Sequence, residues 1–236
     1  MFYTTPLPMS KPALLLSLFF CILSCNKTKE TFHIDGYIDG ATDGDSLIIA
    51  RTTDCVIPEE LAHCVVMNNR FRIEGNVEYV EPAYLYSNTT GGRDCTLFFI
   101  EKGEMTLFAD SAGCRVTGTP LNNLYSNIKD TIELYVAWLE EIEQHYYSNE
   151  PDEQQLAYLS AQGLTLQERL VNYLRNVTRE NIHTPLGLYL LVVYNELFTA
   201  IELRELSRIV PPYIINGCNI PFYKTLTTII EERNKE

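Results

Sequence analysis

The sequence predicts an α+β fold, in which an antiparallel β-sandwich or open barrel is followed by an all-helical C-terminal half. Three observations support this prediction. Residues 32–119 contain short apolar runs separated by turn-forming residues, and the first of these runs alternates with polar residues. From residue 120 onward, apolar residues instead recur every three or four positions, the period of an amphipathic helix. Hydrophobic residues make up 46% of the chain, which favours an ordered core over a disordered chain.

A series of short strands is expected in the first half. Phe32, Ile34 and Ile38 alternate with polar residues, as in a strand that is buried on one face. Two further runs flank Asn68-Asn69, which predicts a tight hairpin because asparagine tolerates a positive φ. A second hairpin is expected around residues 101–104. After the first strand, the segments that we expect to form strands are 47–50, 65–67, 71–73, 84–86, 96–100, 105–108 and 115–117.

The second half should consist of helices. An apolar stripe from Leu121 to Leu139 predicts a long first helix with glutamates near its end. A second helix is expected over 152–181, with Gly163 as a weak point or a break. Thr184-Pro185 fits an N-cap followed by proline at the first helical position. The remaining helices are expected at 185–197, 202–209 and 222–232.

We place a domain boundary near residue 120, with a β-sandwich domain at 32–119 and a helical domain at 120–236. The apolar stripe of the first helix must be covered, since an isolated helix of this kind is marginally stable in water. We therefore expect the helical half to pack against the sheet or against its own helices.

The first 25 residues are typical of an export signal that ends in a lipid attachment site. Lys11 precedes the apolar run 13–23, and the small residue Ser24 stands directly before Cys25. This order predicts a signal peptide at 1–24, lipidation of Cys25 and a lipidated linker at 25–31. The alternative, a membrane span, is too short because a span needs about 20 apolar residues. The expected location is the cell envelope, on the periplasmic face or the cell surface, and the outer membrane above all.

The charge of the chain restricts its partners. The formal net charge is −13, and removal of residues 1–24, which contain Lys11 and no acidic residue, changes it by one unit to −14. Such an acidic chain repels phosphate backbones, so we expect no binding to nucleic acid. Contact with the membrane should come through the acyl chains on Cys25 rather than through basic side chains.

Seven cysteines are present, of which Cys21 lies in the predicted signal peptide and Cys25 is the predicted lipidation site. The other five are Cys55, Cys64, Cys95, Cys114 and Cys218. Disulfides could join Cys55 to Cys64 around a loop and Cys95 to Cys114 around a hairpin, but unpaired thiols fit the sequence equally well. The sequence contains no C-x-x-C, which argues against a dithiol oxidoreductase and against a four-cysteine zinc site.

Several segments of the β half together resemble a known family. They are 33–36, 43–45, 69–75, 98–103 and 116–123. Together they are similar to the domain-of-unknown-function 4369 family, a β-rich module of envelope lipoproteins that usually precedes a helical segment and a thioredoxin-like domain. The resemblance implies the fold, the envelope location and an association with redox partners. It implies no redox activity for this sequence, which ends at Glu236 without a C-x-x-C.

No catalytic, cofactor or metal site is expected. The Asp-Gly pairs at 39–40 and 43–44 could suggest a calcium loop, but Ala41 and Ala50 stand where ligands are needed, so turns are the better interpretation. His63 beside Cys64 is the one adjacent pair of metal-binding residue types. The glutamates around 140–153 fit a solvated helix face better than a glycosidase dyad.

Three functions remain open. The first is a non-catalytic envelope lipoprotein that binds a partner protein or a small ligand. The second is an accessory to envelope thiol-disulfide chemistry, in which Cys218 or the Cys55/Cys64 pair works with a separate thioredoxin-like protein. The third is a carbohydrate-binding component of a surface uptake system, with Trp138 and the pair Tyr146-Tyr147 stacking on sugar rings, although Tyr146 fits a core position as well.

Overall fold

The computed structural model describes residues 30–52, 58–87, 95–111, 113–148, 152–217 and 220–235. The predicted signal peptide and residues Cys25, Cys55 and Cys218 lie outside these ranges, as does the side chain of Cys95.

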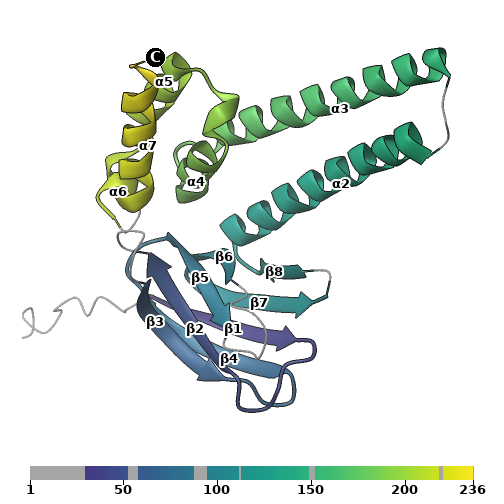
Figure 1. The fold of residues 1–236 in the computed structure, drawn as a ribbon. Helices are drawn as coiled ribbons and strands as arrows, with labels where there is room; N and C mark the ends of the chain where they lie inside the picture. The colour runs from purple at the N-terminus through teal and green to yellow at the C-terminus, as the bar shows by residue number, and fades with distance from the viewer. Residues whose placement is uncertain are drawn as a thin grey trace, which may run out of the picture.

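The first half of the chain forms two four-stranded sheets with the orders β4-β1-β7-β8 and β3-β2-β5-β6. The sheets do not close into a barrel, so the α+β prediction is confirmed in its sandwich form (Figure 1). All strand pairs are antiparallel except β1 with β7, which is parallel. The strands are β1 (Glu30–Ile38), β2 (Ser46–Thr52), β3 (Pro58–Val65), β4 (Arg70–Val77), β5 (Glu81–Ser87), β6 (Cys95–Ile100), β7 (Gly103–Asp110) and β8 (Gly113–Thr117).

The core between the sheets contains two phenylalanines that each lie over a glycine of the neighbouring strand. Phe32 of β1 is paired with Gly75 of β4, and Phe71 of β4 is paired with Gly36 of β1. A Cβ atom on Gly36 would lie 2.0 Å from the Phe71 ring, and one on Gly75 would lie 2.5 Å from the Phe32 ring. Both glycines are therefore required, because their missing side chains make the space that the two buried rings fill.

The turn at Asn68-Asn69 is confirmed, with φ values of 54° and 60° and an isolated bridge between Met67 and Arg70. The strand predicted at 65–67 is misplaced, because β3 runs from Pro58 to Val65. The loop predicted between Cys55 and Cys64 was thus partly wrong. Pro58 is the first residue of an edge strand, where it removes no hydrogen bond from the centre of the sheet.

The hairpin predicted around residues 101–104 is also wrong. β6 belongs to one sheet and β7 to the other, so this segment crosses between the sheets. The reason is the side chain of Glu101, which is only 8% exposed and accepts hydrogen bonds from the backbone N–H groups of Leu121 (2.9 Å) and Asn122 (3.2 Å). A carboxylate at this place satisfies free donors in the first turn of the following helix.

The helical half follows the prediction closely. Gly163 does not interrupt the second helix, and the helix predicted to reach Leu197 ends earlier and continues as a short 3-10 turn. A short helix after Pro211 was not predicted. The elements are α2 (Pro120–Ser148), α3 (Glu153–Glu180), α4 (Pro185–Val193), η2 (Asn195–Leu197), α5 (Ala200–Ile209), α6 (Pro212–Ile215) and α7 (Ile220–Arg233).

Helices α2 and α3 run side by side away from the sandwich, whereas α4 to α7 gather beside it (Figure 1). Among the described residues, no helix is both long enough and apolar enough to cross a membrane.

The base of this helical pair is anchored in a core shared with the sandwich. Phe99 of β6 is fully buried and packs edge to face against Tyr125 of α2 and Tyr189 of α4, at centroid distances of 5.8 and 6.2 Å. The two tyrosine hydroxyl groups lie 3.4 Å apart. Burial raises the pKa of both tyrosines, so both hydroxyl groups stay protonated. Ile128, Val177 and two leucines of α4, Leu186 and Leu190, complete this cluster, which we call the base core.

Asn122 fixes α2 to the edge of the sheet. Its amide oxygen accepts a hydrogen bond from the N–H of Phe99 (2.8 Å), and its amide nitrogen donates to the C=O of the same residue (2.7 Å). The side chain therefore takes the place of a neighbouring strand at the edge strand β6. Asn122 is 1% exposed, so water does not compete for these bonds.

A cluster of ion pairs holds the C-terminal part of α3 against α5. Arg175 and Arg179 of α3 both pair with Glu202 of α5, and both guanidinium groups lie about 5.5 Å from the ring centre of Phe198. Gly187 allows the start of α4 to approach this region, since a Cβ atom there would lie 1.9 Å from the C=O oxygen of Asn181. Both helices of the pair are thus fixed at their base.

Candidate functional site

The best candidate for a functional surface is the outer part of the helical pair, residues 133–168, which we call the arm. The structure describes it except for 149–151. None of the described residues from 129 to 173 is buried, although both helices continue into the base core. About 24 Å of α2 belongs to the arm, at 1.5 Å per residue from Glu133 to Ser148.

The sequence explains why the arm is helical without a core. Asp152 is the N-cap of α3, accepting a hydrogen bond from the backbone N–H of Gln155 (2.8 Å), while the side chain of Gln155 accepts one from the N–H of Asp152 (3.1 Å). This capping box satisfies two free donors at once. Leucine, glutamate, glutamine and alanine, which are good helix formers, dominate the rest of the segment.

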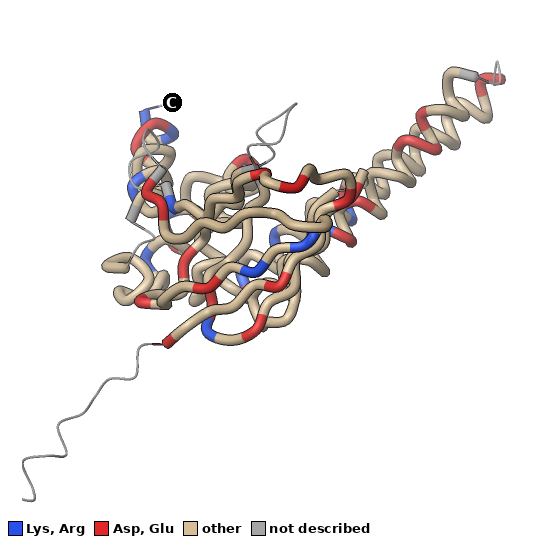
Figure 2. The backbone as a smooth tube through the Cα atoms, turned by 90° about the horizontal axis from the view of Figure 1, so that it is seen from below, with Lys and Arg blue, Asp and Glu red and all other residues tan. Residues whose placement is uncertain are grey.

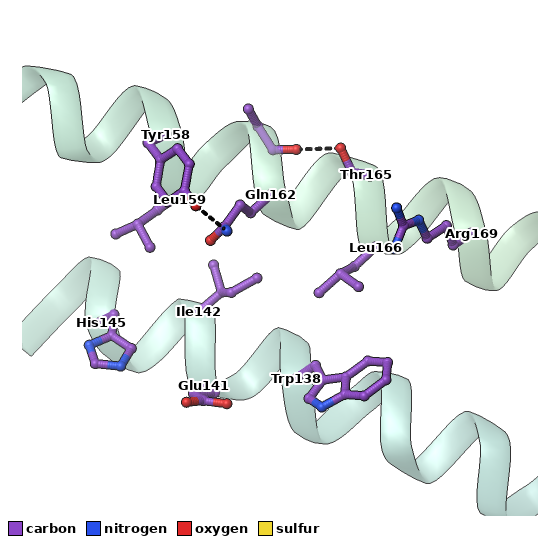
Figure 3. A pocket seen from close by; sticks show the side chains of 11 residues that line it. Trp138, Glu141, Ile142, His145, Tyr158, Leu159, Gln162, Thr165, Leu166 and Arg169 are labelled. Atoms are coloured by element: carbon purple, nitrogen blue, oxygen red, sulfur yellow. Dashed lines mark hydrogen bonds between the residues drawn. The ribbon is translucent and has the colours of Figure 1, made fainter.

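A shallow groove runs between the two helices of the arm (Figure 3). Its floor is apolar, with Ile142 of α2 and Leu159 and Leu166 of α3 pointing toward one another. Its walls are longer side chains: Trp138, Glu141 and His145 on α2, and Tyr158, Gln162, Thr165 and Arg169 on α3. The groove therefore combines an apolar floor with a polar and aromatic rim.

One wall of the groove is ordered by its own hydrogen bonds. Gln162 Nε2 donates to the hydroxyl oxygen of Tyr158 (2.8 Å), and Thr165 Oγ1 donates to the C=O of Ala161 (2.8 Å). Trp138, on the opposite wall, packs edge to face against Tyr135 of its own helix at 5.5 Å. The aromatic side chains are thus held in place along both walls.

Large apolar side chains are exposed over the whole arm. Trp138 is 41% exposed, Tyr158 63% and Tyr147 75%. The full set within the arm is Leu134, Val136, Trp138, Tyr146, Tyr147, Tyr158 and Leu164. Exposed apolar residues gathered on one projection are typical of a surface that another molecule covers.

The charge of the arm is of one sign. Residues 133–168 contain eight acidic residues and no lysine or arginine, between Lys129 on one side and Arg169 on the other. Acidic positions continue along the projecting helices toward their outer end in Figure 2. Exposed tyrosines and a tryptophan beside carboxylates suit a partner that offers both positive charge and apolar surface.

The two cysteines whose side chains the structure describes, Cys64 and Cys114, do not form a common site. Cys64 lies in β3 and Cys114 in β8, which belong to different sheets. Burial raises the pKa of the Cys64 thiol from 9.0 to about 11, so little thiolate is present near neutral pH. Cys25, Cys55 and Cys218 and the side chain of Cys95 lie outside the described residues, so lipidation and both disulfides remain predictions.

The structure does not bring the other candidate residues together into a metal site. His63 Nδ1 lies 2.6 Å from Glu60 Oε1, on the exposed edge strand. The carboxylates of Asp43 and Asp45 accept hydrogen bonds from the backbone N–H groups of Asn68 (2.6 Å) and Thr42 (2.8 Å), as expected for turns. Within the described ranges, no group of three or more histidine, cysteine or acidic side chains could hold a metal ion.

Sequence reasoning found part of the arm and missed the rest. The sequence predicts Trp138 and Tyr146 as candidates for stacking on sugar rings, with a core position as the alternative for Tyr146, and the structure leaves both partly exposed. Tyr158 and Gln162 were missed. The available signal was their spacing with Thr165 and Arg169, which repeats every three or four residues along one helix face.

A protein-family model for a domain of unknown function, DUF4369, matches residues 32–125. This segment therefore forms a domain of that family, and the resemblance noted in the sequence is confirmed. The match covers β1 to β8 and ends at Tyr125, within the base core, so the arm lies beyond the matched residues. No curated protein matches the chain.

Proposed function

We propose that this protein, which carries a DUF4369 domain at residues 32–125, is a non-catalytic envelope lipoprotein that binds a partner protein through its arm. The observation that carries the proposal is that none of the described residues between 129 and 173 is buried, in a helical pair that exposes large apolar side chains. Ordering such a segment costs about 1–2 kcal/mol per residue in backbone entropy, which burial within the arm does little to offset. Contact with a partner would supply the missing burial.

The proposed lipid anchor would place the sandwich near the membrane. Cys25 precedes β1 by five residues, and an extended chain of that length spans at most about 18 Å. The arm projects from the sandwich, so it could reach a protein beyond the anchoring surface (Figure 1).

Partner binding is favoured over thiol exchange at Cys64. A nucleophilic thiol needs a lowered pKa, whereas the pKa of Cys64 is raised to about 11 by burial. No comparable obstacle opposes binding through the arm, since its apolar side chains are already exposed.

The proposal can be tested in the native envelope by site-specific photo-crosslinking. A photoreactive amino acid replaces Tyr147, on the arm, or Phe108, which is 49% exposed on the sandwich. We expect a defined adduct to another protein from position 147 and not from position 108. No adduct at 147, or the same adduct from both positions, would contradict binding through the arm.

The anchor is tested separately by Cys25→Ala. The variant should lose lipid labelling and leave the membrane fraction, because the thioether to the diacyl group cannot form. A variant that remains in the membrane fraction and is cleaved at the same place would show that the lipidation prediction is wrong.

A further inference from the structure

The groove of the arm has the dimensions of a site for one α-helix. The wall on α3 runs from Tyr158 to Arg169, twelve residues separated by eleven helical steps. At 1.5 Å per residue this wall is about 16 Å long, which corresponds to three turns of a helix lying in the groove. Helices packed in this way approach to about 8–10 Å between their axes.

The floor of the groove lacks a third layer. Ile142, Leu159 and Leu166 are half-buried, because each is covered by the neighbouring helix and open toward the groove. An added helix with an apolar stripe would cover them and convert a two-helix layer into a small three-helix core. The stripe would need apolar residues at every third or fourth position.

The acidic residues of the arm indicate which charge the added helix should carry. Of the charged residues that line the groove, Glu141 stands on the α2 wall and Arg169 ends the α3 wall next to the base. Outward from Arg169, residues 133–168 carry eight acidic residues without a lysine or arginine. A second copy of this chain, docking arm to arm, would bring eight more carboxylates and be repelled. A helix with lysine or arginine beside its apolar stripe is complementary.

We propose that the groove between α2 and α3 receives a basic amphipathic helix of a partner protein. This inference rests on the proposed function and specifies its partner: the helix places its apolar stripe on Ile142, Leu159 and Leu166. Its flanking cations lie against Glu141 and the acidic outer part of the arm, away from Arg169 at the base end of the groove, and its aromatic contacts are Trp138 and Tyr158.

Trp138 provides the measurement, because it is the single tryptophan of the chain and lines the groove. The probe is a synthetic amphipathic helix of about 14 residues made of leucine and lysine, long enough to fill three turns. The control probes are a scrambled peptide of the same composition and a leucine–glutamate peptide with the same pattern. We expect a saturable blue shift of the Trp138 emission with the first peptide and none with either control.

Matched variants locate the binding. Tyr158→Ala removes a groove wall residue that is 63% exposed, whereas Leu164→Ala removes an arm residue that is 62% exposed and does not line the groove. Because both side chains are exposed, both variants should fold. Tyr158→Ala should weaken peptide binding about tenfold and Leu164→Ala less than about twofold. Likewise, Glu141→Gln in the groove should weaken binding more than Glu143→Gln outside it.

Three results would overturn the inference: no emission shift, equal binding of the scrambled peptide, or equal effects of Tyr158→Ala and Leu164→Ala. Self-association of the purified full chain in sedimentation, abolished by Tyr158→Ala, would show that a second copy occupies the groove instead. If crosslinking from position 147 succeeds while the peptide fails to bind, the arm binds a partner but the groove does not receive a basic helix. If both fail, the proposed function is wrong as well.

Discussion

The base and the arm belong to the same two helices but differ in how far their side chains are buried. In the base, Ile128 of α2 and Val177 of α3 are buried together with Phe99 of the sheet. In the arm, no described side chain is buried, and Trp138, Tyr147 and Tyr158 are exposed instead. The aromatic residues of the base contact one another around the buried Phe99, whereas the aromatic pairs of the arm, Tyr135–Trp138 and Tyr146–Tyr147, enclose no buried side chain.

This difference separates the residues that hold the fold together from those available for binding. Stability is unevenly distributed in proteins, and segments with few buried contacts open with the least free energy. Substitutions in the base should therefore change the free energy of unfolding. Comparable substitutions in the arm should leave that free energy nearly unchanged and alter association.

The largest expected effect comes from one chemical change made in both regions. Leu186→Ala removes a fully buried side chain from the base core and should lower the free energy of unfolding by about 2–5 kcal/mol, through lost burial and a cavity. Leu164→Ala removes a leucine that is 62% exposed and should change it by less than about 0.5 kcal/mol. Urea unfolding followed by circular dichroism measures both. Similar losses in the two variants would abolish the distinction between base and arm.

A smaller effect is expected at the edge of the sheet. Asn122→Ala leaves the buried N–H and C=O of Phe99 without their partner, which should cost about 1–3 kcal/mol. Asn123→Ala is the matched control, since Asn123 accepts one hydrogen bond from the exposed N–H of Gly118. The same urea titration compares the two, and an equal cost would mean that Asn122 does not anchor α2 to β6.

The smallest effect depends on pH. The pKa of Glu202 is lowered from 4.5, chiefly by the hydrogen bond from the backbone N–H of Thr199 and further by Arg175 and Arg179. A carboxyl group whose pKa is lowered by folding stabilises the fold above its unfolded pKa and loses this contribution as the pH falls through the folded value. Glu202→Gln should therefore be less stable than the wild type near neutral pH.

The difference between Glu202→Gln and the wild type should shrink as the pH falls below about 4.5, the unfolded pKa. Melting temperatures measured across this range test the sign, and Glu205→Gln, an exposed position on α5, is the control. A difference that stays constant with pH would show that the charge of Glu202 does not stabilise the base.

Local patterns in the sequence predicted the sandwich and the long helices well. The two asparagines of the turn at 68–69 act through their own backbone, and Thr184 caps the helix through a hydrogen bond from Gly187, three residues later. Both signals are local, so they are visible without tertiary structure. The hairpin around 101–104 was wrong because Glu101 bonds to Leu121 and Asn122, twenty residues later. A contact of that kind leaves no local pattern.

The candidate site was predicted less well, for a related reason. An amphipathic stripe shows which helix face is apolar but not whether anything covers it. Tyr146 therefore fitted a core position and a surface position equally, and only the path of α2 away from the sandwich decides between them. The absence of lysine and arginine from 133–168 was the available clue that this segment differs from its neighbours.

The most direct test of the central claim is amide hydrogen exchange along α2 and α3 in the purified full chain. Amides between 136 and 146 and between 156 and 167 should exchange at least about 100-fold faster than those around Ile128 and Val177, because the arm can open without disturbing a core. Equal protection along the whole length of both helices would contradict the account. The arm would then be as stable as its base and would need no partner to complete it.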